Sequence, residues 1–326
     1  MKINSRKLGL LTSGGDAPGM NACIRAVVRT ASYYGIQVVG FKHGYSGLVH
    51  NNYIDMDNRT VSNIIQRGGT ILRTARSKEF ETKEGRQQAV DNLTALGVDT
   101  LLAIGGNGTL RGADLLSQQW DGNVIGLPGT IDNDLYGTDY TIGFYTALDT
   151  AQDAIDKIRD TADSFDRIFL VEVMGRMAGF IAQGVGVGGG AEEILVPEQK
   201  IKLENMCKHI AEAKEKGKVS FIIVVAEGAW GGGAINLAKD LQGRTGLPCR
   251  PCVLGHIQRG GSPATLDRLL ATKLGAFAVE MALENQTGVM VGECKNELVM
   301  TPLEKCYSTK KPLDEYLSKI QTILAQ

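Results

Sequence analysis

The sequence has few of the features that mark secreted, membrane or nucleic-acid-binding proteins. Its six cysteines are scattered over 326 residues. That is too few for a disulfide framework and favours a reducing compartment, so we expect a cytoplasmic protein. No apolar run reaches the length of a membrane span, and residues 1–7 lack a signal-peptide core, so we expect a soluble, uncleaved chain without membrane contacts. No stripe of Lys and Arg interleaved with aromatic residues occurs, which argues against nucleic-acid binding.

The common metal and nucleotide motifs are missing or out of context. Cys249 and Cys252 form one CxxC pair, with no second pair and no His at ligand spacing. This argues against zinc and predicts two buried or half-buried thiols. There is no G-x-x-x-x-G-K-[ST] loop and no protein-kinase catalytic loop. A literal G-x-G-x-x-G occurs at Gly184, Gly186 and Gly189, but a strand-like run follows it, so we expect no dinucleotide site there.

What is present indicates a globular α/β chain. Hydrophobic residues make up 43% and charged residues 22%, with a formal charge of -1, and the length predicts two domains. Short apolar runs bounded by glycine alternate with stretches of helical period, which is typical of mostly parallel sheets. Strands are expected over residues 8–11, 37–41, 100–104, 123–127, 167–173 and 220–226. Helices are expected over residues 19–34, 61–66, 86–96, 110–118, 147–161 and 203–216.

Two strand ends resemble one another. Gly14-Gly15 follows one apolar run, Gly105-Gly106 follows another, and each turn leads toward a helix. Paired glycines let the backbone approach an anion, and a helix start offers free amides and a positive dipole end. A tight connection explains either turn alone equally well. Their occurrence together with the aspartates described next favours a nucleotide crevice.

Residues 128–134 set Asp132 and Asp134 two positions apart, just past an apolar segment. If the segment is extended, both carboxylates point to the same side, which suits a general base beside a metal ligand. Aspartates beside Gly and Asn are also common in turns, and for this segment alone the turn is the better interpretation.

A second group of charged residues lies later in the chain. His256 and Arg259 stand three residues apart at a glycine-rich turn, where both could bind a phosphate group. A lone pair of this kind is more often a surface feature. Arg167 and Arg250 each adjoin an apolar run, and a solvated strand end explains them as well as a ligand contact does.

These motifs together resemble the bacterial ATP-dependent 6-phosphofructokinases over nearly the whole chain and in collinear order. The segments that carry the resemblance are Gly14-Gly15-Asp16-Ala17-Pro18-Gly19-Met20-Asn21, residues 105–109, residues 128–134, Met174-Gly175-Arg176 and residues 255–263. The resemblance implies transfer of the γ-phosphoryl group of ATP to the 1-hydroxyl of fructose 6-phosphate. It also implies two similar three-layer α/β/α domains with mostly parallel sheets. The ATP domain would comprise residues 1–143 and 256–305, and the fructose 6-phosphate domain residues 144–255 and 306–326.

The resemblance also implies roles for individual residues. Asp132 would be the general base, Thr130 would position the hydroxyl and the transferring group, and Arg76 and Arg176 complete the catalytic set. The ATP side would consist of Gly14, Tyr45, Arg76, Ser77, Gly106, Asn107, Gly108 and Thr109. The substrate side would consist of Thr130, Asp132, Arg167, Met174, Gly175, Arg176, Glu227, Arg250, His256 and Arg259. Of these, Arg167 and Arg250 would reach into a neighbouring subunit's site, which implies a homotetramer.

Effector and metal sites are implied with departures from the family pattern. ADP or phosphoenolpyruvate would bind between subunits at Arg25, Arg29, Arg159, Gly190, Glu192, Lys216 and Lys218. Asn58 and Asn63 stand where the family usually has Arg and Asp. Mg²⁺ would be held by Asn107 and Asp134, although Asn107 replaces a usual aspartate, so we expect weaker metal binding.

Two alternatives to the ATP-dependent kinase remain. Pyrophosphate-dependent relatives carry Asp and Lys where this chain has Gly108 and Gly129, and the space left by both glycines favours ATP. Ser77 stands where bacterial members often have an aromatic residue, which removes one nucleotide contact. The other alternative is a non-catalytic regulatory subunit, motivated by Asn107 and opposed by the presence of Asp132, Arg76 and Arg176.

Overall fold

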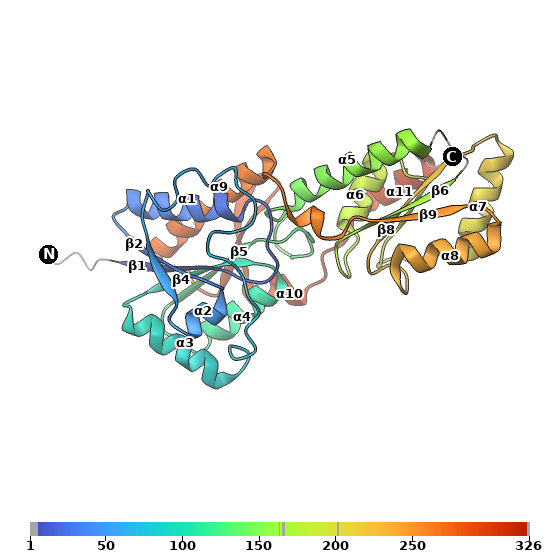
Figure 1. The fold of residues 1–326 in the computed structure, drawn as a ribbon. Coiled ribbons are helices and arrows are strands. Elements are labelled where there is room, and N and C mark those ends of the chain that lie inside the picture. Colours follow the sequence, from blue (N-terminus) through green and yellow to red (C-terminus); the bar gives the residue numbers. More distant parts are fainter. Residues whose placement is uncertain (1–5, 163, 165–166, 201, 325–326) are drawn as a thin grey trace. The chain divides into compact units, whose positions relative to one another are not determined.

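The computed structural model describes residues 6–324 except 163, 165–166 and 201, and helices and strands alternate along it (Figure 1). The strands are β1 (Lys7–Thr12), β2 (Gln37–Phe41), β3 (Tyr53–Met56), β4 (Thr100–Gly105), β5 (Asn123–Pro128), β6 (Ile168–Val173), β7 (Glu193–Leu195), β8 (Phe221–Ala226), β9 (Cys249–Val253), β10 (Val289–Cys294) and β11 (Glu297–Pro302). The helices are α1 (Met20–Tyr33), α2 (Tyr45–Val49), α3 (Lys83–Ala95), α4 (Asn107–Ser117), α5 (Phe144–Ala162), α6 (Phe180–Gly188), α7 (Leu203–Glu215), α8 (Gly233–Thr245), the 3₁₀ turn η1 (Gly255–Arg259), α9 (Thr265–Leu283), α10 (Leu303–Ser308) and α11 (Glu315–Leu324).

The chain folds into two compact units. Unit 1 contains the residues up to Ile131 together with Leu135–Thr146 and Arg259–Lys311. Unit 2 contains Asp132–Asp134, Ala147–Gln258 and the residues from Pro312 onward. The chain therefore passes from one unit to the other several times.

Unit 1 is built on a seven-stranded sheet in the order β11-β10-β5-β4-β1-β2-β3. Its inner strands run parallel, whereas β3 and β11 at the two edges pair antiparallel with their neighbours. Helices α1 and α9 cover one face, and α2, α3 and α4 cover the other (Figure 1). Strand β4 is buried along its whole length, which explains its continuous apolar sequence, because helices cover both faces of the sheet.

The register of unit 1 places the loop after β1 and the loop after β4 together at the carboxyl end of the sheet. Strands β1 and β4 are parallel neighbours, paired from Leu8 with Thr100 to Thr12 with Ile104. The amide of Ser13 donates a hydrogen bond of 3.0 Å to the Ile104 carbonyl just past the ladder. The two glycine pairs that follow these strands therefore lie side by side.

Unit 2 is built on a four-stranded, fully parallel sheet in the order β7-β8-β6-β9. Helices α5, α6 and α11 lie on one face and α7 and α8 on the other (Figure 1). The core beneath α7 and α8 combines Met206 and Ile210 with Leu237 and Leu241 against the sheet. The predicted α/β class with mostly parallel sheets is confirmed.

Of two local predictions, a short helix is wrong and a strand is confirmed. The helix predicted over residues 61–66 is wrong, because that segment forms turns, with Asn63 in the left-handed region at φ 54°. An isolated helix of one or two turns has too few hydrogen bonds to offset its nucleation cost. The predicted strand after the G-x-G-x-x-G motif is confirmed as β7, and the motif itself lies in and at the end of α6.

Close packing explains the glycines of that motif. A β-carbon on Gly184 would lie 2.9 Å from Leu148 of α5, and one on Gly186 would lie 2.4 Å from Ile194 of β7. These glycines let α6 approach its neighbours. Within the part of the chain that the structure describes, no helix combines the length and the apolar character needed to cross a bilayer.

Candidate functional site

In unit 1 the two glycine turns meet at Thr109, in the first turn of α4. A β-carbon on Gly105 would lie 2.3 Å from Thr109 Oγ1 and 2.5 Å from the Ser13 carbonyl. One on Gly14, which has φ +83°, would lie 3.3 Å from the same hydroxyl. Thr109 Oγ1 is buried and has no hydrogen-bond partner among the described residues. An unpaired buried hydroxyl calls for an explanation, and a ligand that reaches it from the glycine turns supplies one.

The start of α4 is open toward solvent. Its N-terminal cap residue, Gly106, has no side chain to accept from the first helical amides. Gly108, one residue into the helix, is exposed, and a β-carbon there would meet nothing within 4 Å. The positive end of the helix dipole therefore stands beside open space, an arrangement that favours phosphate groups.

Tyr45 holds the first turn of α4 through a hydrogen bond to its backbone. Its hydroxyl donates a hydrogen bond of 2.7 Å to the Thr109 carbonyl, and its ring stacks on Phe80 with 4.0 Å between ring centroids. The side chain is buried, and burial raises the pKa of its hydroxyl. Tyr45, which was predicted for the ATP side, thus has its hydroxyl bound to the backbone of α4.

Thr130 faces the same turn. A β-carbon on Gly106 would lie 3.3 Å from Thr130 Cβ and 3.6 Å from its hydroxyl oxygen. Of the other residues predicted for the ATP side, Arg76 is exposed and Ser77 is half-buried, in the loop between β3 and α3. The Ser77 hydroxyl accepts from the Phe80 amide at 3.3 Å.

The segment of Asp132 and Asp134 is bent, so the condition for a same-side pair of carboxylates is not met. Asn133 between them adopts φ 53°, in the left-handed region. Asn tolerates this conformation better than most residues, because its short side chain can bond locally. The turn interpretation of this segment is therefore the correct one.

Asp132 is 4% exposed and lies in unit 2 beside Arg176. Arg176 Nε is 3.6 Å from Asp132 Oδ2, and the arginine side chain is itself 61% exposed. A buried carboxylate is costly unless its charge is compensated, and Arg176 provides that compensation. The pair joins a candidate base to a cation that can still reach solvent or a ligand.

Two side chains hold the loop that carries Arg176. Gln258 Oε1 accepts from the Met174 amide at 2.8 Å, and Glu227 Oε1 accepts from the Arg176 amide at 2.6 Å. Gly175 has φ +135°, and a β-carbon there would lie 2.4 Å from the Ala178 carbonyl, so only glycine fits. The loop is thus fixed in a conformation that presents the arginine.

These residues gather at the carboxyl edge of the sheet of unit 2. The Met174 loop follows β6, Glu227 follows β8, and His256 follows β9, and these three strands are parallel neighbours. Open α/β sheets place their ligands at this edge. Of the predicted substrate residues, His256 is exposed there.

Three predicted arginines lie elsewhere. Arg167 precedes β6 and Arg250 is the second residue of β9, so both lie toward the amino edge of the same sheet. Arg250 is exposed. Arg259 belongs to unit 1, where its guanidinium donates a hydrogen bond of 3.1 Å to the Asp16 carbonyl and fills the space over Gly15.

The predicted effector residues of unit 2 form a charged cluster around Glu192. Lys218 Nζ lies 2.7 Å and Arg159 Nη1 lies 4.0 Å from Glu192 Oε1. Arg159 also donates to the Gly189 and Gly190 carbonyls at 2.6 and 2.8 Å. Two cations therefore flank one half-buried carboxylate.

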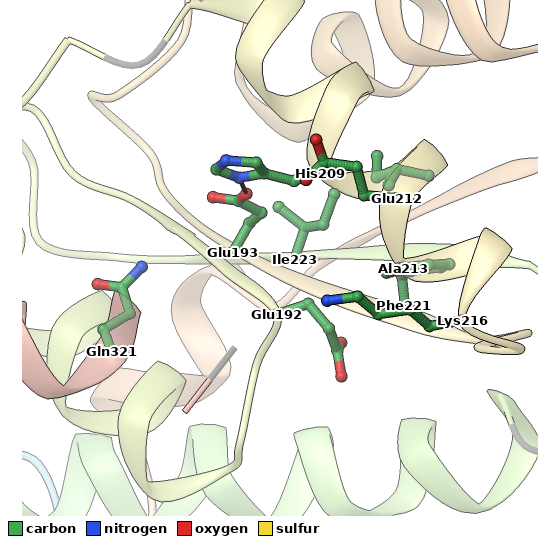
Figure 2. Close-up of a pocket in the computed structure, with 10 residues that line it drawn as sticks. Glu192, Glu193, His209, Glu212, Ala213, Lys216, Phe221, Ile223 and Gln321 are labelled. Carbon is green, nitrogen blue, oxygen red and sulfur yellow. Dashed lines mark hydrogen bonds and ion pairs between the residues drawn. The ribbon is translucent and has the colours of Figure 1, made fainter. Parts of the chain in front are cut away.

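A cavity of about 420 Å³ adjoins this cluster (Figure 2). Glu192 and Lys216 line it together with the ion pair of His209 and Glu193, whose Nδ1 and Oε1 atoms are 2.7 Å apart.

The predicted effector residues of unit 1, Arg25 and Arg29, lie on α1. Burial and the neighbouring Arg29 lower the pKa of Arg25. Asn58 donates a hydrogen bond of 3.0 Å to Ser32 of the same helix.

A family model described as phosphofructokinase matches residues 7–282. The chain belongs to the phosphofructokinase family. It is 52% identical over 320 residues to ATP-dependent 6-phosphofructokinase 1 of Thermus thermophilus, covering 98% of this chain and 99% of that protein. It is 50% identical to the ATP-dependent 6-phosphofructokinase of a Thermoanaerobacter species, with the same coverage. The structure of phosphofructokinase from Saccharomyces cerevisiae superimposes with a TM-score of 0.87 at 35% identity, and the chain covers 46% of that longer protein.

As a phosphofructokinase, the chain is a kinase that needs a metal ion. Among the described residues, no group of three or more His, Cys, Asp and Glu side chains could hold one. Mg²⁺ in kinases is typically bound by one or two protein oxygens together with substrate phosphates. Asp134, which is half-buried beside Asn133, and Asn107, at the start of α4, have oxygens of the kind that such an ion binds.

The sequence did not predict a role for Gln258, although its side chain holds the loop of Met174 to Arg176 through a hydrogen bond. It lies between the predicted His256 and Arg259, is fully buried, and bonds a backbone amide far away in the sequence. A buried amide that supports another residue's backbone leaves no spacing pattern. The only available signal was a polar residue flanked by predicted ligands.

Proposed function

We propose that this chain transfers the γ-phosphoryl group of ATP to the 1-hydroxyl of fructose 6-phosphate, the glycolytic reaction, in the cytoplasm. The observation that carries the proposal is the buried Asp132 carboxylate paired with Arg176 in a fixed loop. The relatives that are about half identical over their full length, and are named ATP-dependent, support ATP as the donor.

In this reaction Asp132 acts as the general base. It takes the proton of the sugar hydroxyl as the oxygen attacks phosphorus in line with the departing ADP oxygen. Arg176, which neighbours the base, and Arg76, in its exposed loop, offset the negative charge that spreads over the phosphoryl oxygens. Thr130 holds the transferring group from its position opposite Gly106.

The glycine turns and the start of α4 bind the phosphates of ATP. Backbone amides of the Gly14 and Gly106 turns donate to phosphate oxygens, and the Thr109 hydroxyl gains the partner that it lacks. Asp134 and Asn107 are the residues that would hold Mg²⁺, which neutralises phosphate charge when bound. An amide in place of a carboxylate brings no charge, so metal binding is expected to be weaker than with an aspartate.

Fructose 6-phosphate binds to the carboxyl edge of unit 2. Met174, Gly175, Arg176, Glu227 and His256, all of unit 2, form its site. Arg167 and Arg250, which lie toward the other edge of the sheet, serve the site of a neighbouring subunit in a homotetramer. ADP or phosphoenolpyruvate binds as effector between subunits, where one subunit contributes the charged cluster of Arg159, Gly190, Glu192, Lys216 and Lys218 and another contributes Arg25 and Arg29.

The test is steady-state turnover of fructose 6-phosphate with ATP and, separately, with pyrophosphate, for the wild type and for Asp132→Ser. Mg²⁺ is titrated in each assay. Removal of a general base typically costs a factor of roughly 10² to 10⁴. We expect turnover with ATP alone, falling by about this factor in the variant while its melting temperature is unchanged.

Other outcomes separate the alternatives. Turnover with pyrophosphate but not ATP would identify a pyrophosphate-dependent enzyme. Binding of fructose 6-phosphate without turnover from either donor would point to a regulatory subunit and make Asn107 the first residue to test. Restored turnover in Asn107→Asp would then distinguish a weakened metal site from a chain that lost catalysis altogether.

A further inference from the structure

The loop that follows β5 in unit 1 folds back so that its last residues pair with its first residues. The Ile142 amide donates a hydrogen bond of 2.8 Å to the Pro128 carbonyl, and Gly129 and Ile142 form an isolated parallel bridge. The first and last parts of this loop therefore run side by side directly after the strand. Thr130 lies in the first part and Thr141 in the last.

Thr141 bonds the backbone of Thr130. Its hydroxyl donates to the Thr130 carbonyl at 2.6 Å, and the Thr141 side chain is fully buried. That carbonyl belongs to the peptide group joining Thr130 to Ile131. Because a peptide group is planar, a short bond to its oxygen fixes the backbone rotations on both sides of it.

The fixed peptide directs a side chain toward the start of α4. Thr130 Cβ lies 3.3 Å from where a β-carbon on Gly106 would stand. The bond restrains the ψ rotation of Thr130, which sets where its side chain lies relative to Ile131. A change in this rotation would alter the position of the side chain relative to the chain that enters the Asp132 segment.

The end of the loop after Thr141 is held by hydrogen bonds to α9, so the position of Thr141 is fixed. Asp267 of α9 accepts from the Gly143 amide at 2.8 Å and from the Thr146 amide at 2.7 Å. The Thr146 hydroxyl bonds the same carboxylate at 2.6 Å and accepts from the Ala264 amide. The Thr141 hydroxyl can therefore hold the Thr130 carbonyl without moving toward it.

We propose that Thr141 is a positioning residue for phosphoryl transfer, acting through the Thr130 carbonyl. The inference rests on the proposed function, in which Thr130 holds the transferring group. Misplacement of a reacting group by about 1 Å can cost roughly 10²-fold in rate. Loss of the Thr141 hydroxyl should therefore lower kcat, while KM for ATP and for fructose 6-phosphate changes little.

The test compares three variants with the wild type. Thr141→Val keeps the shape and removes the hydroxyl, and Thr141→Ser keeps the hydroxyl. Thr138→Val is the matched control, because Thr138 is also buried in this loop and bonds a carbonyl, that of Tyr140 at 2.8 Å. Each protein is assayed for kcat, for both KM values and for melting temperature.

We expect Thr141→Val to lower kcat about 10- to 100-fold. Thr141→Ser should stay within about threefold of wild type, and Thr138→Val should lose melting temperature as Thr141→Val does while keeping its kcat. Equal loss of kcat in the two valine variants, or no loss in Thr141→Val, would overturn the inference while an active wild type upholds the proposed function. A wild type without turnover would refute both.

Discussion

At the scale of single residues, Gly108 and Gly129, the two glycines from which the sequence predicts ATP as the donor, are glycine for different reasons. A β-carbon on Gly129 would lie 2.8 Å from Ile104, which is fully buried. Gly108 has open space around it. Packing alone explains Gly129, so the donor argument from the sequence now depends on Gly108.

This difference predicts the behaviour of Gly108→Asp. A carboxylate in the first turn of a helix is favourable for the helix, so the melting temperature should stay the same or rise. The same charge stands where the phosphates of ATP are proposed to bind, so KM for ATP should rise by about tenfold or more, by repulsion of roughly 1.4 kcal/mol or more. Steady-state kinetics and thermal unfolding of the variant check both parts.

Two alanine variants serve as controls. Gly108→Ala should leave KM near wild type and keep or raise the melting temperature, because its methyl group meets nothing and alanine favours a helix more than glycine does. Gly129→Ala should lower the melting temperature, because Ile104 must move. An unchanged KM for ATP in Gly108→Asp would show that no phosphate group lies near this helix start.

The residues that sequence reasoning found and those it missed differ in kind. Asp132 and Arg176 stand in glycine-bounded motifs, and the structure brings them within 3.6 Å of one another. Thr141 and Gln258 act by bonding a backbone group of a distant residue. Such a bond depends on tertiary structure and needs no particular neighbour in sequence, so no spacing rule identifies these two.

At the scale of elements, one helix caps another. Helix α5 begins at Phe144, and the amides of Gly143 and Thr146 at its start are satisfied by Asp267, in the first turn of α9. The first amides of a helix have no partners within it, so they need an acceptor from outside. A single carboxylate thus ties the beginnings of two helices together.

The buried carboxylate also predicts a dependence of stability on pH. Burial raises the pKa of Asp267 above its ordinary value of 3.8. The folded protein then binds the proton more tightly than the unfolded chain, so the contribution of this group to stability falls as pH rises through the folded-state pKa. Asp267→Asn cannot titrate and also places an amide donor among amide donors.

Asp267→Asn should therefore be less stable than wild type by about 1–3 kcal/mol. The deficit should be larger near pH 4.5 than at pH 7.5, because the wild type alone loses stability over that range. Urea unfolding of both proteins at several pH values measures it. A deficit that grows with pH would mean that the three donors around the carboxylate outweigh burial and lower its pKa.

The elements divide in the same way between those the sequence predicts and those it does not. The strand expected over residues 37–41 coincides with β2, because its apolar run ends where burial ends. Helix α9 was not predicted, because α1 and β5 enclose it and it lacks a single apolar stripe. A pattern method detects elements with one buried face better than elements buried on several.

At the scale of the whole molecule, variants of Arg250 can show whether each active site contains residues of two subunits. It is exposed and lies away from the carboxyl edge where Arg176 and Glu227 gather. If it serves a neighbouring subunit, then Asp132→Ser and Arg250→Ala each disable sites by a different subunit's defect. Mixed tetramers would contain some sites with both residues intact, about a quarter of them under random assembly in equal amounts.

We therefore expect activity to return when the two variants are unfolded together and refolded as a mixture, assayed at low fructose 6-phosphate. A mixture of Asp132→Ser with the double variant Asp132→Ser/Arg250→Ala is the control, because it contains no intact base. Recovery no greater than the sum of the separately refolded variants would place Arg250 in its own subunit's site or in none.

The order of strands in unit 1 has a consequence for synthesis on the ribosome. Strand β5 lies in the middle of the sheet, yet its partner β10 is encoded near the other end of the chain, after all the strands of unit 2. While the nascent chain grows, one side of β5 exposes unpaired amides and carbonyls beside apolar residues, which is a surface prone to aggregation. A ribosome that stalls before β10 would release a chain with this edge open, so synthesis of this protein should depend strongly on chaperones that bind exposed strands.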